Sequence, residues 1–293
     1  MKSSKKTEIL HCSPFNQVRY GKEYGTCYSQ QNLIDIANEY NKLSQHKINI
    51  HQSHEQLHTD LEKAFQKICK DELCWVNNDI INNPELRNKV TNAFRPPKPR
   101  SWYDDKNTWL NTYDIVFVLE QYEKLYQDFK LMGVYPIDFA LNDEDDRCIG
   151  DELCDFDIKK LKAQEKSQFG IVLNLDYHDE PGSHWVSLFC NLNPKKKNYG
   201  IFYYDSVANP PPDEVIEFMD LIKTQVNNKK FKVKSNKIQK QFGNFDCGMF
   251  CIIFMTQILK EQFSFEFICK HMHTDKEINR LRDVIYSPSK SSS

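Results

Sequence analysis

Apolar residues recur three and four positions apart in the first third of the chain, the spacing that places them on one face of an α-helix. This pattern predicts helices over residues 29–43 and 57–68. A third short helix is predicted from Pro84, because proline is tolerated at a first helical position. The pattern stops at residues 95–100, which read RPPKPR, because proline lacks an amide donor and restricts the residue before it. We therefore predict an N-terminal helical arm over residues 1–94, followed by a second domain.

The second domain is predicted to be an α+β core over residues 95–286. It begins with a long amphipathic helix, because apolar residues form a stripe over residues 115–129. Short runs rich in aromatic and β-branched residues predict the strands of a buried central sheet, at residues 169–175, 184–190, 199–204 and 231–233. Helical spacing returns at residues 213–226 and 247–259. The serine-rich tail, residues 287–293, is predicted to be disordered.

Composition and charge exclude several classes of partner. Charged residues make up 27% of the 293 residues, with both signs interspersed and a formal net charge of -2, so no overall field favours nucleic acid or an anionic membrane. The longest apolar run, residues 249–255, is too short to cross a bilayer. The basic start at residues 1–6 is followed by no apolar signal region. We expect a protein that is neither secreted nor inserted in a membrane and that has no evident nucleic-acid partner.

The ten cysteines are spread over the chain without a repeating spacing, unlike the disulfide framework of a small secreted domain. We therefore expect a reducing compartment, which would keep a catalytic thiol reduced. Cys148 and Cys154 are interpreted as flanking an acidic surface turn.

A metal site is weakly suggested by a run of histidines in the arm. Cys69 and Cys74, which would have to support it, lack the spacing of a zinc knuckle, and a solvated helix explains the histidines better. No metal and no other cofactor is expected. The histidines are His46, His51, His54 and His58.

Cys247 is the predicted nucleophile. By itself, a cysteine at the head of an apolar helix is more often a buried core thiol. A thiol attacks a carbonyl usefully only as the thiolate, however, and the start of a helix supplies the electropositive setting that this form needs. The apolar residues that follow Cys247 would bury the helix and hold the thiol rigidly at its amino end.

The partners that a catalytic thiol needs precede Cys247 in the chain. His184 opens a predicted strand directly after a turn, so its imidazole can project from the strand end and act as a general base. Asp205 ends the next predicted strand and would orient that imidazole if the two strands are neighbours. The side chain of Gln241 and the backbone amide of Cys247 could stabilise an oxyanion, and Asn244 is a competing donor.

The order of these residues resembles the Ulp/SENP and adenovirus-protease group of cysteine peptidases. The matching residues, in chain order, are His184, Trp185, Asp205, Gln241 and Cys247, the last within the motif DCGMF. Residues 109–111, followed by Ile115, are similar to the tryptophan-bearing substrate element of the SUMO proteases. More narrowly, residues 90–285 resemble the polyprotein-processing proteases of African swine fever virus and other large DNA viruses.

The resemblance implies a papain-like or adenain-like core with an N-terminal helical arm. It implies cleavage of structural or core polyproteins after Gly-Gly-Xaa motifs during virion maturation, so a viral polyprotein is the expected partner. The expected location is the host cytoplasm, at viral assembly sites, and the virion. The oligomeric state does not follow from the sequence.

The resemblance also implies residue roles. The catalytic set is Cys247, His184, Asp205 and Gln241, and the substrate-binding set is Trp185, Trp109, Asn111 and Asn244. Trp185 and Trp109 are expected to hold the substrate in a cleft that only glycines pass. The African swine fever enzyme has Asn where this chain has Asp205, which indicates that the orienting group is interchangeable in charge.

Three other functions are compatible with these residues. A protease that removes SUMO or a ubiquitin-like modifier would use the same catalytic set. Some bacterial effectors with a similar order of His, acid and Cys are acetyltransferases. A binding module with a dead site would keep the fold and lose the chemistry. The arm and the viral resemblance favour polyprotein processing.

Overall fold

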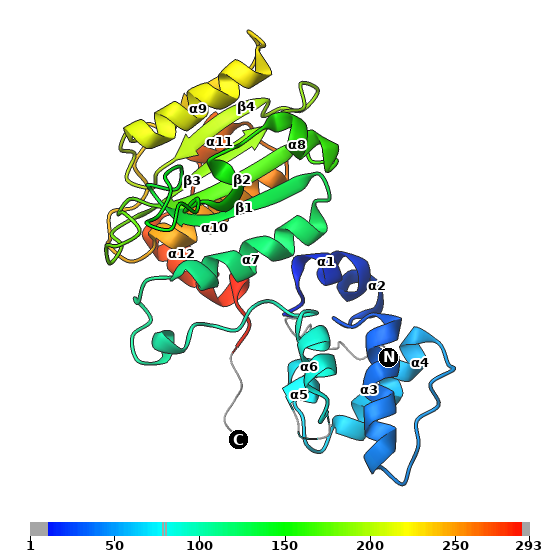
Figure 1. Cartoon of the computed structure of the whole chain (residues 1–293). Coiled ribbons are helices and arrows are strands. Elements are labelled where there is room, and N and C mark those ends of the chain that lie inside the picture. The colour runs from blue at the N-terminus through cyan, green and yellow to red at the C-terminus, as the bar shows by residue number, and fades with distance from the viewer. Residues whose placement is uncertain (1–10, 78, 80, 289–293) are drawn as a thin grey trace. The chain divides into compact units, whose positions relative to one another are not determined.

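The computed structural model describes residues 11–77, 79 and 81–288. The chain divides into two compact units: the first holds the chain up to Lys98 and again from Asp283, and the second runs from Pro99 to Arg282 (Figure 1). The basic start at residues 1–6 and the tail from residue 289 lie outside the described residues.

Ser287 belongs to the packed part of the first unit, although the sequence analysis assigned it to a disordered tail. Ser287 is buried, its amide donates to the carbonyl of Pro96 at 2.8 Å, and its carbonyl accepts from the amide of Lys98 at 3.0 Å. This pairing keeps residues 95–98 in the first unit, whereas the expected boundary placed them in the second. A serine in a Ser/Pro-rich segment carries no sequence signal of such pairing.

The first unit is helical. Its two longest helices are α3 (Gln30–Leu43) and α4 (His54–Phe65), and each begins after a serine whose side chain accepts a hydrogen bond from a first-turn amide. α6 (Pro84–Thr91) starts at Pro84, as predicted. The apolar faces of α3, α4 and α6 pack around one core. The shorter elements are α1 (Pro14–Asn16), η1 (Gln17–Gly21), α2 (Lys22–Tyr24) and α5 (Glu72–Asn77).

Six of the ten cysteines form disulfides. The sequence analysis expected no disulfide framework, and for these six cysteines that expectation is wrong. The pairs are Cys12–Cys27, Cys69–Cys74 and Cys148–Cys154. The two cysteines of each pair lie only 15, 5 and 6 residues apart in the chain, so each disulfide closes a short segment. Cys148–Cys154 thus closes the acidic turn that the sequence analysis treated as simply solvated.

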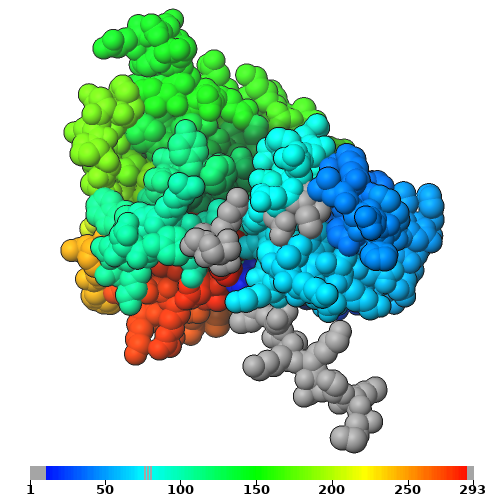
Figure 2. All heavy atoms as spheres, turned by 90° about the horizontal axis from the view of Figure 1, so that it is seen from below, coloured from blue at the N-terminus to red at the C-terminus, as the bar shows by residue number. Residues whose placement is uncertain are grey.

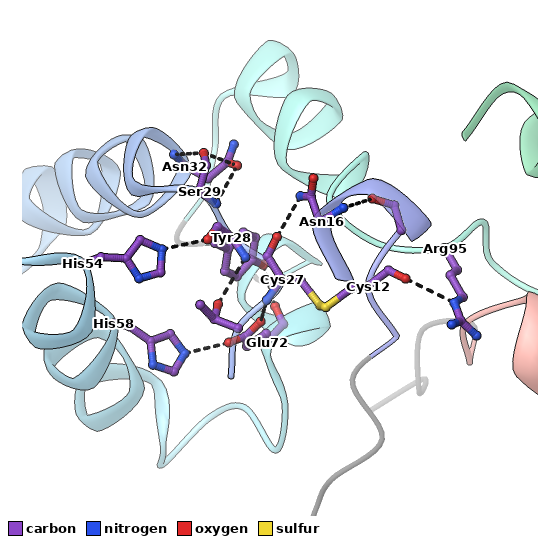
Figure 3. Close-up of a disulfide and its surroundings, with 12 residues drawn as sticks. Cys12, Asn16, Cys27, Tyr28, Ser29, Asn32, His54, His58, Glu72 and Arg95 are labelled. Atoms are coloured by element: carbon purple, nitrogen blue, oxygen red, sulfur yellow. Dashed lines mark hydrogen bonds and ion pairs between the residues drawn. A yellow bond between two sulfur atoms is a disulfide. The ribbon is translucent and has the colours of Figure 1, made fainter. Parts of the chain in front are cut away.

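Figure 3 shows the surroundings of the Cys12–Cys27 disulfide, where two of the arm histidines have protein partners. His54 donates through Nε2 to the carbonyl of Tyr28 at 2.9 Å, and His58 Nε2 pairs with the carboxylate of Glu72 at 2.6 Å. The same carboxylate accepts the amide of Cys27 at 2.9 Å. These contacts explain His54 and His58 as structural residues.

The second unit is built on a five-stranded mixed sheet in the order β1-β2-β3-β4-β5. β2, β3 and β4 pair antiparallel, while the outer strands β1 and β5 run parallel to their neighbours. The three central strands lie where the sequence predicts them and are buried nearly throughout. The strands are β1 (Phe129–Pro136), β2 (Gln168–Asn174), β3 (Trp185–Asn191), β4 (Gly200–Tyr204) and β5 (Lys232–Ser235).

Helices cover both faces of the sheet (Figure 1). α8 (Ile158–Ala163) and α9 (Asp213–Val226) pack on one face, and α10 (Cys247–Leu259) lies on the other, where Phe254 stacks on Tyr204 with the ring centroids 4.6 Å apart. α7 (Thr112–Leu125) packs against α10 and β1. The other elements are η2 (Arg100–Tyr103), η3 (Asp151–Leu153), α11 (Phe265–Lys270) and α12 (Asp275–Ile285). The result is an α+β core, as predicted.

The predicted helix over residues 115–129 is too long at its C-terminal end. α7 ends at Leu125, and Phe129 begins β1, a strand that the sequence analysis missed. β1 contains a register shift between Leu131 and Gly133, and Gly133 has φ +143°, so the strand lacks a regular alternation of buried and exposed residues. Among the described helices, none is both long and apolar enough to cross a bilayer.

We predict that Phe254→Ala lowers the free energy of unfolding by about 3–5 kcal/mol, because it empties a fully buried site between α10 and the sheet. Phe117→Ala is the matched control, since Phe117 is 51% exposed, and it should change stability by at most about 0.5 kcal/mol. Chemical denaturation of both variants measures this. Equal losses would contradict the assignment of Phe254 to the core.

Candidate active site

The ends of two adjacent strands bring His184 and Asp205 together. β3 and β4 are antiparallel neighbours, with Ser187 opposite Tyr204, so the start of β3 and the end of β4 lie at the same edge of the sheet. His184 immediately precedes β3, and Asp205 immediately follows β4. The two strands are therefore neighbours, which is the condition under which Asp205 was expected to orient His184.

Asp205 holds the imidazole of His184 from a fully buried position. Its Oδ1 lies 2.7 Å from His184 Nε2, and the two carboxylate oxygens also accept the amides of Val207 at 2.9 Å and Asn209 at 3.1 Å. Asp205 is 0% exposed, so these donors replace the water that its charge would otherwise require. The tight turn after β4 thus supplies both the carboxylate and two of its donors.

Asn236 fixes the backbone of Asp205, a role that the sequence analysis missed. Its side-chain oxygen accepts the Asp205 amide at 2.9 Å, and its side-chain nitrogen donates to the Asp205 carbonyl at 2.6 Å. Asn236 directly follows β5, which runs parallel to β4, and this topology places it beside Asp205. Only the three-dimensional pairing of β4 with β5 reveals this contact.

Cys247 is the first residue of α10 and is 2% exposed. The first amides of a helix have no intrahelical acceptor and give its amino end a partial positive charge, which favours a thiolate there. Gly248 lets this end pack tightly, because a side-chain carbon at that position would lie 3.1 Å from Leu110 and 3.3 Å from Ile115. The thiol is therefore held rigidly where α10 meets the segment before α7.

The electrostatics of His184 depend on both neighbours. Burial lowers the pKa of its imidazole, but hydrogen bonds to Asp205 and Cys247 outweigh burial and raise the pKa to about 9. Because Nε2 faces Asp205, Nδ1 is the ring nitrogen left for Cys247. At neutral pH the imidazole is thus protonated, with a carboxylate on one side and the sulfur on the other.

The other free cysteines have different surroundings. Burial raises the pKa of Cys190 and Cys251 well above the usual range, and it raises the pKa of Cys269 to about 12, so all three stay protonated thiols. Of the four free cysteines, Cys247 is the one that contacts an imidazole at a helix start. It is therefore the candidate nucleophile of the described site.

Gln241 is buried and has a fixed orientation. Ser206 Oγ donates to its side-chain oxygen at 2.6 Å, while its side-chain nitrogen donates to the carbonyl of Gly243 at 2.8 Å. The nitrogen carries a second N–H for another acceptor. Ser206, which directly follows Asp205, is a second residue that the sequence analysis missed.

Asn244, the competing donor, lies on the surface of the same loop. Its side chain is exposed, whereas Gln241 is 3% exposed. The burial and the fixed orientation of Gln241 favour it over Asn244 as an oxyanion donor.

Trp109, Asn111 and Trp185 line a cavity of about 460 Å³, and Trp185 directly follows His184 in the chain. His184, Cys247 and Gln241 do not themselves line this cavity. Trp185 donates from Nε1 to the carbonyl of Leu110 at 3.0 Å, which joins the two tryptophan-bearing segments. Trp109 is 40% exposed, so its ring is available to a ligand. The side-chain oxygen of Asn111 accepts the amide of Asp114 at 3.0 Å and caps α7, which gives Asn111 a structural task as well.

This arrangement can perform nucleophilic acyl transfer. It combines a thiol at a helix start, an imidazole whose pKa that thiol raises, a buried carboxylate and amide donors nearby. Among the described residues, no group of three or more histidines, cysteines and acidic residues could hold a metal ion.

Comparison with known proteins agrees with this chemistry. Residues 140–291 match the family model described as YopJ Serine/Threonine acetyltransferase, a range that contains His184, Asp205 and Cys247. The chain is 28% identical over 298 aligned residues to a putative thiol protease of Acanthamoeba polyphaga mimivirus, with 93% of each chain covered. It is 26% identical over 243 residues to a cysteine protease of African swine fever virus, covering 77% of this chain and 86% of the relative.

A solved structure has the same fold. The crystal structure of the African swine fever virus protease superimposes with a TM-score of 0.61 at 21% identity, covering 85% of this chain and 95% of the other. At that identity the likeness shows the fold alone. The mixed sheet flanked by helices is thus a cysteine-protease fold.

We predict that the imidazole of His184 titrates near pH 9, because Asp205 and Cys247 stabilise its protonated form. The raised pKa means that protonation adds stability that is complete below the unfolded value of about 6.5 and is lost as pH rises through about 9. Asp205→Asn should lower the pKa, because it removes the charge. NMR titration of labelled histidine measures both values.

Asp213→Asn is the control for this titration, since Asp213 is exposed on α9 and should leave His184 unchanged. A midpoint for His184 close to 6.5 in the unmodified protein would contradict the prediction.

Proposed function

Because the chain belongs to the family described as YopJ Serine/Threonine acetyltransferase and is homologous to viral thiol and cysteine proteases over most of its length, we propose that it is a viral cysteine endopeptidase. Its proposed substrates are structural polyproteins cleaved after Gly-Gly-Xaa motifs during virion maturation, at viral assembly sites in the host cytoplasm. The homology to proteases covers 93% of the chain, including the arm and Trp109, whereas the family model begins at residue 140. This difference in coverage favours peptide hydrolysis over acetyl transfer.

One observation carries the proposal: the imidazole of His184 bonds Asp205 at 2.7 Å, and both Asp205 and Cys247 raise its pKa. The proton on that imidazole has two uses in peptide cleavage. While it is present, its charge stabilises the thiolate. After the attack, it is the proton that the leaving amine needs.

The proposed reaction has two halves. In the first, the Cys247 thiolate attacks the peptide carbonyl carbon, His184 gives its proton to the leaving amine, and the C–N bond breaks to leave a thioester. In the second, His184 takes a proton from water as the water attacks the thioester, and the C–S bond breaks to release the acid and restore the thiolate. Asp205 keeps the imidazole oriented throughout.

The negative oxygen that forms in each half needs donors. The backbone amide of Cys247 is free of an intrahelical acceptor because it opens α10. We assign the second donor to the side chain of Gln241, whose orientation Ser206 fixes. Preorganised donors of this kind need no rearrangement when the charge appears.

The tryptophan-lined cavity supports the choice of glycine. A substrate chain that reaches Cys247 would pass between Trp109 and Trp185, which the bond from Trp185 to Leu110 holds close to each other in the fold. Residues without a side chain fit such a passage best. Specificity in this proposal is therefore steric.

Acetyl transfer is the second candidate, and the family match is the observation that favours it. The same thioester would form, and a hydroxyl or an amine would replace water as the acceptor. Removal of SUMO or a related modifier is a third use of the same residues, because a relative from African swine fever virus carries the name SUMO-1 cysteine protease. The two protease functions differ only in the substrate.

We predict that Cys247→Ala and His184→Ala each lower cleavage of a Gly-Gly-Xaa peptide by about 10³-fold or more, because each removes a group that acts in the reaction. Cys269→Ala and His271→Ala are the matched controls, since neither residue contacts the site. Initial rates by mass spectrometry measure the effect. Near-normal activity of either catalytic variant would overturn the assignment.

The same preparation should separate the three candidate functions. We expect cleavage of the Gly-Gly-Xaa peptide, slower cleavage of a SUMO fusion, and no transfer from acetyl-coenzyme A to a peptide that offers serine, threonine and lysine. If acetyl transfer depends on Cys247 and no peptide is cleaved, the protein is an acetyltransferase, as the family description states, and the proposed function is wrong. Faster cleavage of the SUMO fusion than of the peptide would identify a SUMO-like modifier, rather than a viral polyprotein, as the substrate.

Gln241→Ala is predicted to lower kcat by about 10²–10³-fold with little change in KM, because an oxyanion donor acts only once the charge forms. Asn244→Ala should change kcat by less than about fivefold, since Asn244 is exposed on the same loop. Steady-state kinetics of both variants decide between them. The reverse ranking would assign the donor to Asn244.

A further inference from the structure

Arg282 is a buried cation at the edge of the catalytic unit that no step of the proposed reaction uses. It lies in α12, is 3% exposed, and makes five hydrogen bonds, the number of N–H groups on a guanidinium. The five hydrogen bonds offset the desolvation cost of burying this charge, and loss of the partners would leave the charge uncompensated. The partners of Arg282 belong to two segments, and both reach the active site.

The first segment carries the nucleophile. Arg282 donates from Nε at 3.0 Å and from Nη2 at 2.7 Å to one oxygen of Asp246, and from Nη2 to the carbonyl of Phe245 at 3.1 Å. Asp246 directly precedes Cys247, and its carbonyl accepts the amide of Phe250 in the first turn of α10. Arg282 therefore holds the residue that joins the Gln241 loop to the thiol.

The second segment carries one wall of the substrate cavity. Arg282 Nη1 donates to the carbonyls of Lys106 at 2.8 Å and Thr108 at 3.2 Å. Its guanidinium carbon lies 4.3 Å from the ring centroid of Trp102, and Trp102 Nε1 donates to the same Thr108 carbonyl at 2.9 Å. Thr108 directly precedes Trp109, which lines the cavity. In Figure 2 the teal surface of this segment lies against the red surface of α12.

Lysine could not replace these contacts. A guanidinium is planar, spreads its donors over a fixed fork and stacks on an aromatic ring, whereas an ammonium is a compact charge with three donors. The fork is what allows one side chain to bond the Asp246 carboxylate, three carbonyls and the Trp102 face together. A change from Arg to Lys thus keeps the charge and loses the bridge.

We propose that Arg282 is a positioning residue that holds the Trp109 wall of the substrate passage in register with Cys247. It acts through Asp246 and Thr108 and does not touch the substrate. The inference rests on the proposed function, since it concerns the fit of glycine between that wall and the thiol. Loss of the bridge lets the wall move relative to the sulfur, which relaxes the selection of glycine and slows attack together.

The test compares Arg282→Lys and Asp246→Asn with Lys196→Met in the full chain. Lys196 bonds Asp128 at 2.7 Å and Glu261 at 2.9 Å, so its variant removes an ion pair of the same unit that touches neither segment. Each variant is assayed on a Gly-Gly-Xaa peptide and on the same peptide with the second glycine changed to alanine. Thermal unfolding gives the folded fraction.

We expect Arg282→Lys to lower kcat/KM on the glycine peptide by about 10²-fold, the scale of a small misplacement of reacting groups. The ratio of the glycine to the alanine rate should fall at least about fivefold, since a moved wall admits the larger residue. Asp246→Asn should lower the ratio in the same direction, and Lys196→Met should leave it unchanged. This ratio does not depend on how much protein is folded.

An unchanged ratio in folded Arg282→Lys would overturn the proposal and leave Arg282 as a stabilising residue only. If Arg282→Lys does not fold, the ratio in Asp246→Asn decides in the same way. If the unmodified protein cleaves neither peptide, the proposed function fails. In that case the bridge is tested by the rate at which Cys247 reacts with a Gly-Gly vinyl sulfone, divided by its rate with iodoacetamide. If this relative rate is lower in Arg282→Lys than in the unmodified protein, the bridge is supported. If the two relative rates are equal, the bridge is rejected.

Discussion

The site depends on the hydrogen bond between His184 and Asp205. The register of the sheet places these two residues close enough to form it. The antiparallel pairing of β3 with β4 sets the start of one strand beside the end of the other, and a slip by one residue would turn each side chain to the other face. Asp205 is fully buried, so it needs the amides of the turn after β4 as well as the imidazole. The pair also raises the pKa of His184 far enough for the imidazole to carry its proton at neutral pH.

The parts of this arrangement that were predictable from sequence are those that depend on local pattern. The bounds of α9 and α10 follow from helical spacing over residues 213–226 and 247–259, and the central strands are buried on both faces and so read as short continuous apolar runs. The positions of His184 and Asp205 at strand ends follow from the same pattern, because a turn residue lies beside each. Their proximity needed one further assumption, that consecutive strands are neighbours, and consecutive strands commonly are.

The parts that were not predictable depend on contacts between distant segments or on irregular backbone. β1 was missed because a register shift breaks its alternation, and the predicted helix before it ran on to Phe129, the first residue of the strand. Asn236, Ser206 and Arg282 are polar residues in ordinary loops or on an amphipathic helix, and only their partners distinguish them. The disulfides were missed because spacings of 5, 6 and 15 residues carry no framework signal, although the fold brings the two Cα atoms of each pair within 5.9 Å.

The site chemistry alone does not distinguish a peptidase from an acyltransferase, since both proceed through the same thioester on Cys247. What separates them is the group that reaches that thioester, and this is decided by the surfaces around the sulfur rather than by the triad. In this chain the segment before α7 forms such a surface: Leu110 contacts the start of α10, Trp109 lines the cavity, and Trp185 bonds to the same segment. That segment lies outside the residues that match the acetyltransferase model and inside those that match the proteases. In the proposed function this surface selects the acceptor and the substrate, so the alignment with the proteases, which includes the segment, is the better guide to both.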